Sequence, residues 1–193
     1  MGLFGKKKAT TPQAGPSQEH TAEFDNLVRQ LLARDDIQGR TDVCEHIFAF
    51  AKQLLQNPTR ETIMRAYDLM GNLAAQFGYV PAMLWLGDFM ENVQHNDKSA
   101  CIWYQRAADQ GSGEGARNYA DMLMAGKGVE RNQREALKYY TIAMEKNIPE
   151  AAFVVGEFLR TTGDAEGAAM ANQKALNLGY APARMRLEQM KKI

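Results

Sequence analysis

The chain has 193 residues, and its 23 basic and 23 acidic side chains give a formal net charge of zero. A hydrophobic share of 45% is typical of a globular protein, and the absence of a basic excess argues against a DNA- or RNA-binding module. The two cysteines, Cys44 and Cys101, lie far apart and form no CxxC pair. We therefore expect a reducing, cytoplasmic location and no disulfide framework.

Residues 1–18 are rich in Gly, Pro, Ser, Thr and Gln and contain almost no hydrophobic residue after Phe4. Such a segment cannot bury enough apolar surface to offset the entropy lost on folding, so we predict a flexible basic tail. Its lysines, Lys6, Lys7 and Lys8, allow a weak contact with an anionic membrane surface, but a solvated tail is the favoured interpretation. No signal peptide is expected, because the segment after Lys8, ATTPQAGPSQ, contains no apolar stretch. No integral membrane segment is expected, because no run of about 18 apolar residues occurs.

Residues 19–78 have the apolar spacing of helices. Apolar residues between Phe24 and Leu32 recur at intervals of three and four, which places them on one face of a helix. A second apolar stripe follows Asp42 and ends at Pro58, because proline lacks a backbone N–H and disfavours helix in the residue before it. We predict N-terminal helices here that form a degenerate repeat.

A repeat becomes visible when Ala100, Ala136 and Ala168 are aligned, at spacings of 36 and 32 residues. Two aromatic residues follow each of the first two anchors by three and four positions, and an alanine follows all three anchors by seven. Eleven positions after the anchors stand residues that tolerate the left-handed conformation ending a helix. These residues are Gly111, Asn147 and Gly179. Each anchor therefore opens the buried face of one helix.

The next helix along the chain begins its own apolar face four residues after each closing residue. The small residues that open this face are Ala82, Gly115, Ala151 and Ala183. Further along these helices, Gly87 and Gly156 allow neighbouring helices to approach closely. We predict that residues 79–193 comprise three helix-turn-helix repeats and a C-terminal capping helix near Ala183–Lys192.

Four stretches of these units follow a known pattern: MLWLG at 83–87, AxxWYxxAA at 100–108, GKGV at 126–129 and AxxYYxxA at 136–143. The pattern resembles the SEL-like (Sel-one-like) repeat, a relative of the tetratricopeptide repeat, over roughly residues 60–193. In the third unit, Ala171 and Asn172 replace the aromatic pair. The resemblance implies an all-α fold, a right-handed α-solenoid of stacked helix-turn-helix repeats, in which the first helix of each unit lines a concave face.

The glycine-rich turns raise the question of a phosphate site. Gly126-Lys127-Gly128 lacks the Ser or Thr that follows the lysine of a P-loop, and GSGEG at 111–115 follows a helix rather than a strand. Both stretches are therefore interpreted as turns between helices.

No residue pattern predicts catalysis or metal binding. Cys44 and His46 are two residues apart on a predicted helix, so they point in different directions and cannot readily share a metal ion. Asp97 follows His95 closely, but it fits better as the cap of a helix starting near Lys98. No serine lies in a GxSxG motif. We therefore predict no enzyme activity, no cofactor and no metal site.

A recognition surface is expected on the first helix of each unit, two, three and six positions past its opening residue. These positions are Leu84, Trp85 and Asp88, then Arg117, Asn118 and Asp121, then Phe153, Val154 and Glu157. Aromatic and arginine side chains contribute disproportionately to interfaces, so the row suits an extended peptide or a helix. For Trp85 and Phe153, packing against neighbouring helices is an equally good interpretation. The eleven methionines fit core filling better than a binding groove.

The resemblance implies a non-catalytic adaptor or scaffold that holds a protein partner in its concave face. An immunity- or chaperone-like protein that caps one client, such as a secreted effector, shares the fold and stays open as an alternative. An enzyme handling cell-wall or β-lactam ligands is disfavoured, because relatives with that reported role pair cysteines within each repeat, and this chain has only two cysteines.

Overall fold

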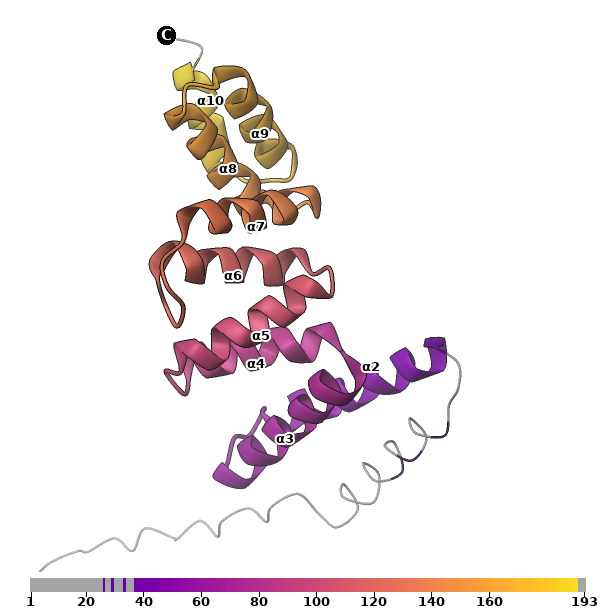
Figure 1. Cartoon of the computed structure of the whole chain (residues 1–193). Coiled ribbons are helices and arrows are strands. Elements are labelled where there is room, and N and C mark those ends of the chain that lie inside the picture. Colours follow the sequence, from indigo (N-terminus) through magenta and orange to yellow (C-terminus); the bar gives the residue numbers. More distant parts are fainter. Residues whose placement is uncertain (1–25, 27–28, 30–32, 34–36, 191–193) are drawn as a thin grey trace, which may run out of the picture. The chain divides into compact units, whose positions relative to one another are not determined.

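The structure, a computed structural model, describes residues 26, 29, 33 and 37–190 (Figure 1). The described residues form nine helices and no strand, which confirms the all-α fold class. None of these helices has the length and hydrophobicity that crossing a bilayer requires. The predicted tail at 1–18, with its lysines, and the apolar residues of the helix predicted from Phe24 to Leu32 lie outside the described residues. The chain divides into two compact units, with the boundary between Leu69 and Met70.

The first unit contains α2 (Ile37–Leu54) and the first half of α3 (Arg60–Phe77). α2 begins ahead of Asp42, earlier than the apolar stripe predicted, and ends before the proline as expected. Its buried side chains are Val43, Cys44, Ile47, Phe50 and Ala51. At the start of α3, the backbone N–H of Thr59 donates to Thr62 Oγ1 at 2.8 Å, and that of Thr62 donates to Thr59 Oγ1 at 3.1 Å. This reciprocal cap fixes where α3 begins.

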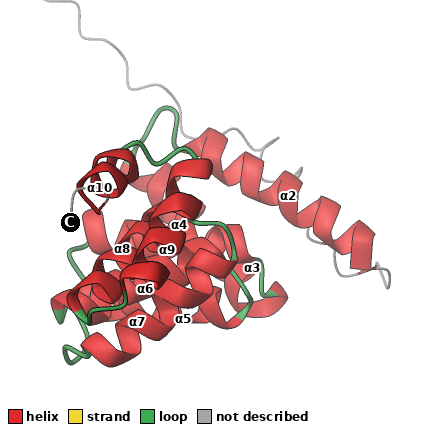
Figure 2. Cartoon of the chain, turned by 90° about the horizontal axis from the view of Figure 1, so that it is seen from above, coloured by secondary structure: helices red, strands yellow, loops and turns green. Residues whose placement is uncertain are grey.

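The second unit is an α-solenoid built from helix pairs. Its helices are α4 (Val80–Asn92), α5 (Asp97–Asp109), α6 (Gly113–Ala125), α7 (Gln133–Glu145), α8 (Pro149–Thr161), α9 (Ala165–Asn177) and α10 (Pro182–Met190). From α4 to α10 each helix packs against the next along the chain, as the stack in Figure 1 shows. In Figure 2 the described helices are joined by loops alone. α10 lies where the capping helix was expected.

The predicted helix ends adopt the left-handed conformation. Gly78, Gly111, Asn147 and Gly179 have φ angles of 63°, 83°, 63° and 95°. Glycine has no Cβ to clash in this conformation, and asparagine is among the other residues that tolerate it best. The turns confirm the repeat register that the sequence predicted.

The predicted anchor alanines form the core of the stack. The fully buried alanines of the repeat register are Ala82, Ala100, Ala107, Ala136, Ala143, Ala151, Ala168, Ala175 and Ala183. A methyl group is small enough to let successive helices lie close together while still excluding water. Larger apolar side chains, such as Leu86 and Leu123, fill the space between the alanine contacts and are also buried.

One predicted cap is wrong by a residue. Asn96, not Asp97, is the N-cap of α5: its side-chain oxygen accepts a hydrogen bond from the backbone N–H of Ser99 at 3.0 Å. Asparagine and aspartate are nearly equal as caps, so the sequence alone did not discriminate between neighbours. Asp97 becomes the first helical residue, where the positive end of the helix dipole stabilises its carboxylate.

Candidate functional site

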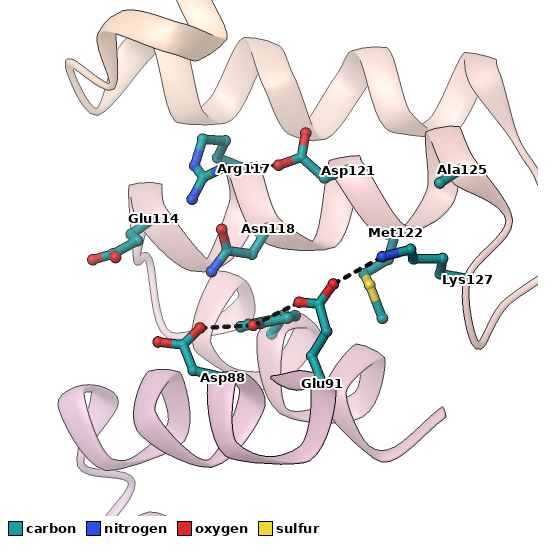
Figure 3. Close-up of a pocket in the computed structure, with 10 residues that line it drawn as sticks. Asp88, Glu91, Glu114, Arg117, Asn118, Asp121, Met122, Ala125 and Lys127 are labelled. Carbon is teal, nitrogen blue, oxygen red and sulfur yellow. Dashed lines mark hydrogen bonds and ion pairs between the residues drawn. The ribbon is translucent and has the colours of Figure 1, made fainter. Parts of the chain in front are cut away.

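An open pocket of about 430 Å³ lies between α4 and α6, the first helices of two consecutive repeats (Figure 3). Its lining residues are Asp88, Glu91, Tyr104, Glu114, Arg117, Asn118, Asp121, Met122, Ala125 and Lys127. We call it the α4–α6 pocket. It brings together four of the residues proposed from the repeat register, namely Asp88, Arg117, Asn118 and Asp121. That these residues bind a protein stays a prediction.

Tyr104 of α5 holds the carboxylates on the α4 side of the pocket. Its side chain is buried, and its hydroxyl donates to Asp88 Oδ1 at 2.7 Å and approaches Glu91 Oε2 at 3.2 Å. Burial, and then the hydrogen bond to Asp88, raises the pKa of Tyr104 well above its ordinary value of 10. The hydroxyl therefore keeps its proton near neutral pH and fixes the orientation of Asp88.

The ring of Tyr104 reaches this position because α4 has a glycine beneath it. A Cβ atom at Gly87 would lie 2.4 Å from a ring carbon of Tyr104, far inside van der Waals contact. In the next repeat, Ala120 stands at the equivalent position and is fully buried. In the first repeat, the glycine of the LG pair therefore receives the second aromatic residue of the WY pair.

The α6 side of the pocket repeats this arrangement with an added cation. Asp121 accepts a hydrogen bond from the hydroxyl of Tyr140 on α7, as Asp88 does from Tyr104. Its other carboxylate oxygen, Oδ2, lies 2.8 Å from Nη1 of Arg117, one turn earlier on the same helix. Burial, followed by the hydrogen bond to Asp121, raises the pKa of Tyr140. Asp121 is thus held from two sides.

The turn after α6 closes the other end of the pocket. Lys127 Nζ lies 3.2 Å from Glu91 Oε1 on α4, so the GKGV turn of one repeat is linked to the helix of the repeat before it. Gly128 makes this approach possible: its φ is 67°, and a Cβ there would lie 2.3 Å from the carbonyl carbon and oxygen of Asp97. The glycines of this turn lie between two helices, as the sequence indicated, and Gly128 also allows close packing.

The pocket carries more negative than positive side chains. Its charged residues are four carboxylates and two cations: Asp88, Glu91, Glu114 and Asp121, and Arg117 and Lys127. Both cations are engaged by carboxylates of the pocket, in the Lys127–Glu91 and Arg117–Asp121 pairs. Among the described residues, no cation forms an ion pair with Asp88 or Glu114. The α4–α6 pocket therefore has a formal excess of two negative charges.

The remaining predicted residues lie outside this pocket. Leu84 and Trp85 are half-buried on α4, and Trp85 stacks on Phe89 with ring centroids 5.0 Å apart. Phe153 is half-buried on α8 and packs on Tyr180, with ring centroids 5.2 Å apart. Both aromatic side chains thus have intramolecular packing partners, which was the alternative interpretation.

Glu157, the third acidic residue of the row, forms ion pairs with two arginines. It pairs with Arg160 at 3.3 Å on its own helix and with Arg186 of α10. The contact with Arg186 joins Glu157 Oε1 to the guanidinium Nε as an ion pair, without the alignment of a good hydrogen bond. At the position of the repeat tyrosine stands Asn172, which is fully buried and donates back to Ala168 O at 2.8 Å.

Several lining residues escaped the prediction from the register. Glu114 lies before the counted positions of its helix, Glu91 lies beyond them, and Lys127 lies in the turn after α6. Tyr104 was noted only as part of the aromatic pair of the repeat. Lys127 reaches the pocket because its turn folds back onto the preceding repeat, a contact between residues 36 positions apart. Positions counted along a single helix cannot reveal a residue that a neighbouring repeat supplies.

Comparison with known proteins identifies the repeats. The Sel1 repeat family matches residues 74–112 and 113–148, which contain the four helices α4 to α7. A Sel1 repeat protein from Oxalobacter formigenes superimposes with a TM-score of 0.65 at 25% identity, over 98% of this chain and 56% of that one. A protective antigen of uropathogenic Escherichia coli strains, which displays an SLR fold, gives a TM-score of 0.69 at 23% identity, over 86% of this chain and 35% of that one. The second likeness shows the fold alone.

An uncharacterized protein from Neisseria meningitidis serogroup B is 31% identical over 87 residues, which are 45% of this chain and 18% of that protein. The chain therefore spans less than two thirds of the length of each of these relatives. Sel1 repeat proteins generally mediate protein–protein interactions, and the family is generally of a non-catalytic scaffold type. Residues 74–112 and 113–148 are therefore two Sel1 repeats, and the left-handed turns in register and the buried anchor alanines agree with that match.

Proposed function

We propose that the chain is a non-catalytic adaptor or scaffold that binds a segment of a protein partner, an extended peptide or a helix, in the α4–α6 pocket. The observation that carries this proposal is the convergence of four register-predicted residues from two repeats on one open pocket. An opening of about 430 Å³ accommodates a few side chains of a partner, not a whole domain.

The character of the lining also supports binding. Asn118 makes no side-chain hydrogen bond within the described part of the chain, so its amide can pair with the backbone of an incoming segment. Asp88 and Asp121 are already oriented by tyrosine hydroxyls, so less entropy is lost when they engage a ligand. Rigid polar groups around an open pocket favour recognition of a preformed or extended segment.

The test is selection of displayed random peptides on the immobilised full-length chain, followed by affinity measurement on variants. Asn118→Trp fills the pocket without changing its charge, and Gln133→Trp adds the same ring at an exposed position of α7. Pocket binding predicts at least a tenfold loss of affinity, about 1.4 kcal/mol, for the first variant and little change for the second. Circular dichroism shows that both variants keep their helices.

The selected sequences also separate an adaptor from a protein dedicated to one client. Several unrelated peptides that compete for one site favour an adaptor, and one strong consensus favours a single client. If the affinities of all selected peptides are the same for Asn118→Trp and the wild-type chain, the pocket is not the binding surface and the proposal is wrong.

We also propose that the protein acts in the cytoplasm. Cys44 and Cys101 are both unpaired and buried, as is usual for thiols in a reducing compartment. Burial raises the pKa of both thiols, which makes them poor nucleophiles and unreactive toward oxidants. Fractionation of cells that produce the untagged chain tests this proposal, which recovery outside the cytoplasmic fraction would contradict.

A further inference from the structure

We propose that the partner segment is basic and places a lysine or arginine side chain in the α4–α6 pocket, between Asp88 and Glu114. This inference rests on the proposed function and specifies its chemistry. It concerns the open α4–α6 pocket, and it commits to one kind of occupant by charge complementarity.

The first step of the argument is the charge that the protein leaves uncompensated. Lys127 and Arg117 are each within 3.2 Å of a pocket carboxylate, so their charges are already balanced by Glu91 and Asp121. Asp88 and Glu114 have no such partner in the described residues. A cationic side chain entering here meets two unpaired carboxylates, whereas an anionic side chain meets repulsion from both.

The second step is the remaining hydrogen-bonding capacity. A carboxylate offers about four acceptor positions, and Asp88 spends one of them on the Tyr104 hydroxyl. The others remain open to the N–H groups of a lysine or arginine. Figure 3 shows Asp88 and Glu91 extending from α4, and Asn118 from α6, toward the space between the two helices. Asn118 is therefore placed to pair with the backbone beside a bound basic side chain.

The third step is the contrast with the last repeat. At the position equivalent to Asp88 and Asp121, Glu157 is flanked by both Arg160 and Arg186. The same acidic position thus has an arginine partner in α6, where Arg117 pairs with Asp121, and in α8, where two arginines pair with Glu157. Among the described residues, Asp88 of α4 has no such partner, so the preference for a basic segment is local to the α4–α6 pocket.

The experiment uses three labelled peptides of equal length, Lys–Ala, Glu–Ala and Gln–Ala repeats, and measures their binding to the full chain by fluorescence anisotropy. Asp88→Asn/Glu114→Gln removes the two unpaired charges with little change in shape. Glu145→Gln/Glu166→Gln removes two charges from exposed positions of α7 and α9 and is the matched control. We expect the Lys–Ala peptide to bind tightest, and the pocket variant to weaken it on the order of tenfold. The control should stay within about twofold.

Two results would overturn the inference. Equal weakening by both double variants would mean that the whole surface, not the pocket, attracts the peptide, and tighter binding of the Glu–Ala peptide would reverse the assigned charge. Neither result affects the proposed function, which Asn118→Trp tests independently of charge. A partner displaced by Asn118→Trp but indifferent to Asp88→Asn/Glu114→Gln would support the pocket and refute its basic specificity.

Discussion

The first two repeats of the second unit and the helices that follow them use one backbone register for different purposes. In α4–α7 a tyrosine from the second helix donates to an acidic residue of the first, in the pairs Tyr104–Asp88 and Tyr140–Asp121. In α8–α9 the tyrosine position holds Asn172, and the acidic residue turns to arginines. The repeat therefore fixes the scaffold, whereas residues that vary within it decide where a charged site is left open.

The strongest test of this comparison is the GKGV turn, which occurs in the second repeat only. Gly128→Ala is expected to destabilise the chain by about 3 kcal/mol or more, because the added Cβ combines an unfavourable positive φ with a clash against the Asp97 backbone. Gly163 also has a positive φ, 88°, but nothing lies within 4 Å of its Cβ position. Gly163→Ala should therefore cost only about 1 kcal/mol, and chemical denaturation followed by circular dichroism measures both. Equal losses of unfolding free energy for the two variants would show that the turn does not pack closely against α5.

The second test concerns the buried polar position of each repeat. Tyr104→Phe removes the donor to Asp88 and is expected to destabilise the chain by about 1.5 kcal/mol, because the bond is to a charged acceptor. Asn172→Leu should stay within about 1 kcal/mol of the wild type, since the amide oxygen of Asn172 is buried without a partner and its loss offsets the lost hydrogen bond. Urea unfolding of both variants gives the difference. If Asn172→Leu proved the more damaging, the asparagine would be the stronger polar contact of the two.

The third test is alkaline stability, which should depend on the tyrosines of α4–α7. Burial raises the pKa of Tyr119 from 10 to about 12, and also raises those of Tyr104 and Tyr140. A pKa raised by folding means stability that is complete below pH 10 and is lost as the pH rises through the folded value. The denaturant concentration at the midpoint of unfolding should therefore decrease as the pH rises from about 10 to 12. Tyr119→Phe should make this fall shallower, and an unchanged slope would contradict the assignment.

The repeat architecture could be predicted from the sequence because it depends on local and periodic signals. Anchor alanines such as Ala100 recur at fixed spacing, and Gly111 and Asn147 stand where a left-handed residue is needed. Both signals act within one helix pair, so counting along the chain recovers them. The same counting selected Asp88 and Asp121 on the first helices of two consecutive repeats, and the structure brings both to the α4–α6 pocket.

The rest of the pocket depends on contacts between repeats, which counting does not capture. Lys127 belongs to one repeat and pairs with Glu91 of another, after a turn whose path Gly128 permits. The cap at Asn96 rather than Asp97 is a choice between two nearly equal residues, decided by the backbone path after His95, whose φ is 52°. The stacking of Trp85 on Phe89 depends on side-chain rotamers, which the sequence does not specify.

The smallest expected effect on stability separates recognition from folding. Arg117 and Arg160 both pair with an acidic residue of their own helix, at 2.8 and 3.3 Å, so replacing either with alanine should cost only about 0.5 kcal/mol. Their effects on binding should differ. Arg117→Ala leaves Asp121 uncompensated inside the α4–α6 pocket and should tighten binding of the Lys–Ala peptide by about threefold at low salt. Arg160→Ala should leave binding unchanged, because Arg186 still faces Glu157 outside the pocket. Weaker binding by Arg117→Ala would mean that the arginine itself contacts the partner, and the charge preference assigned to the first two repeats would have to be reversed.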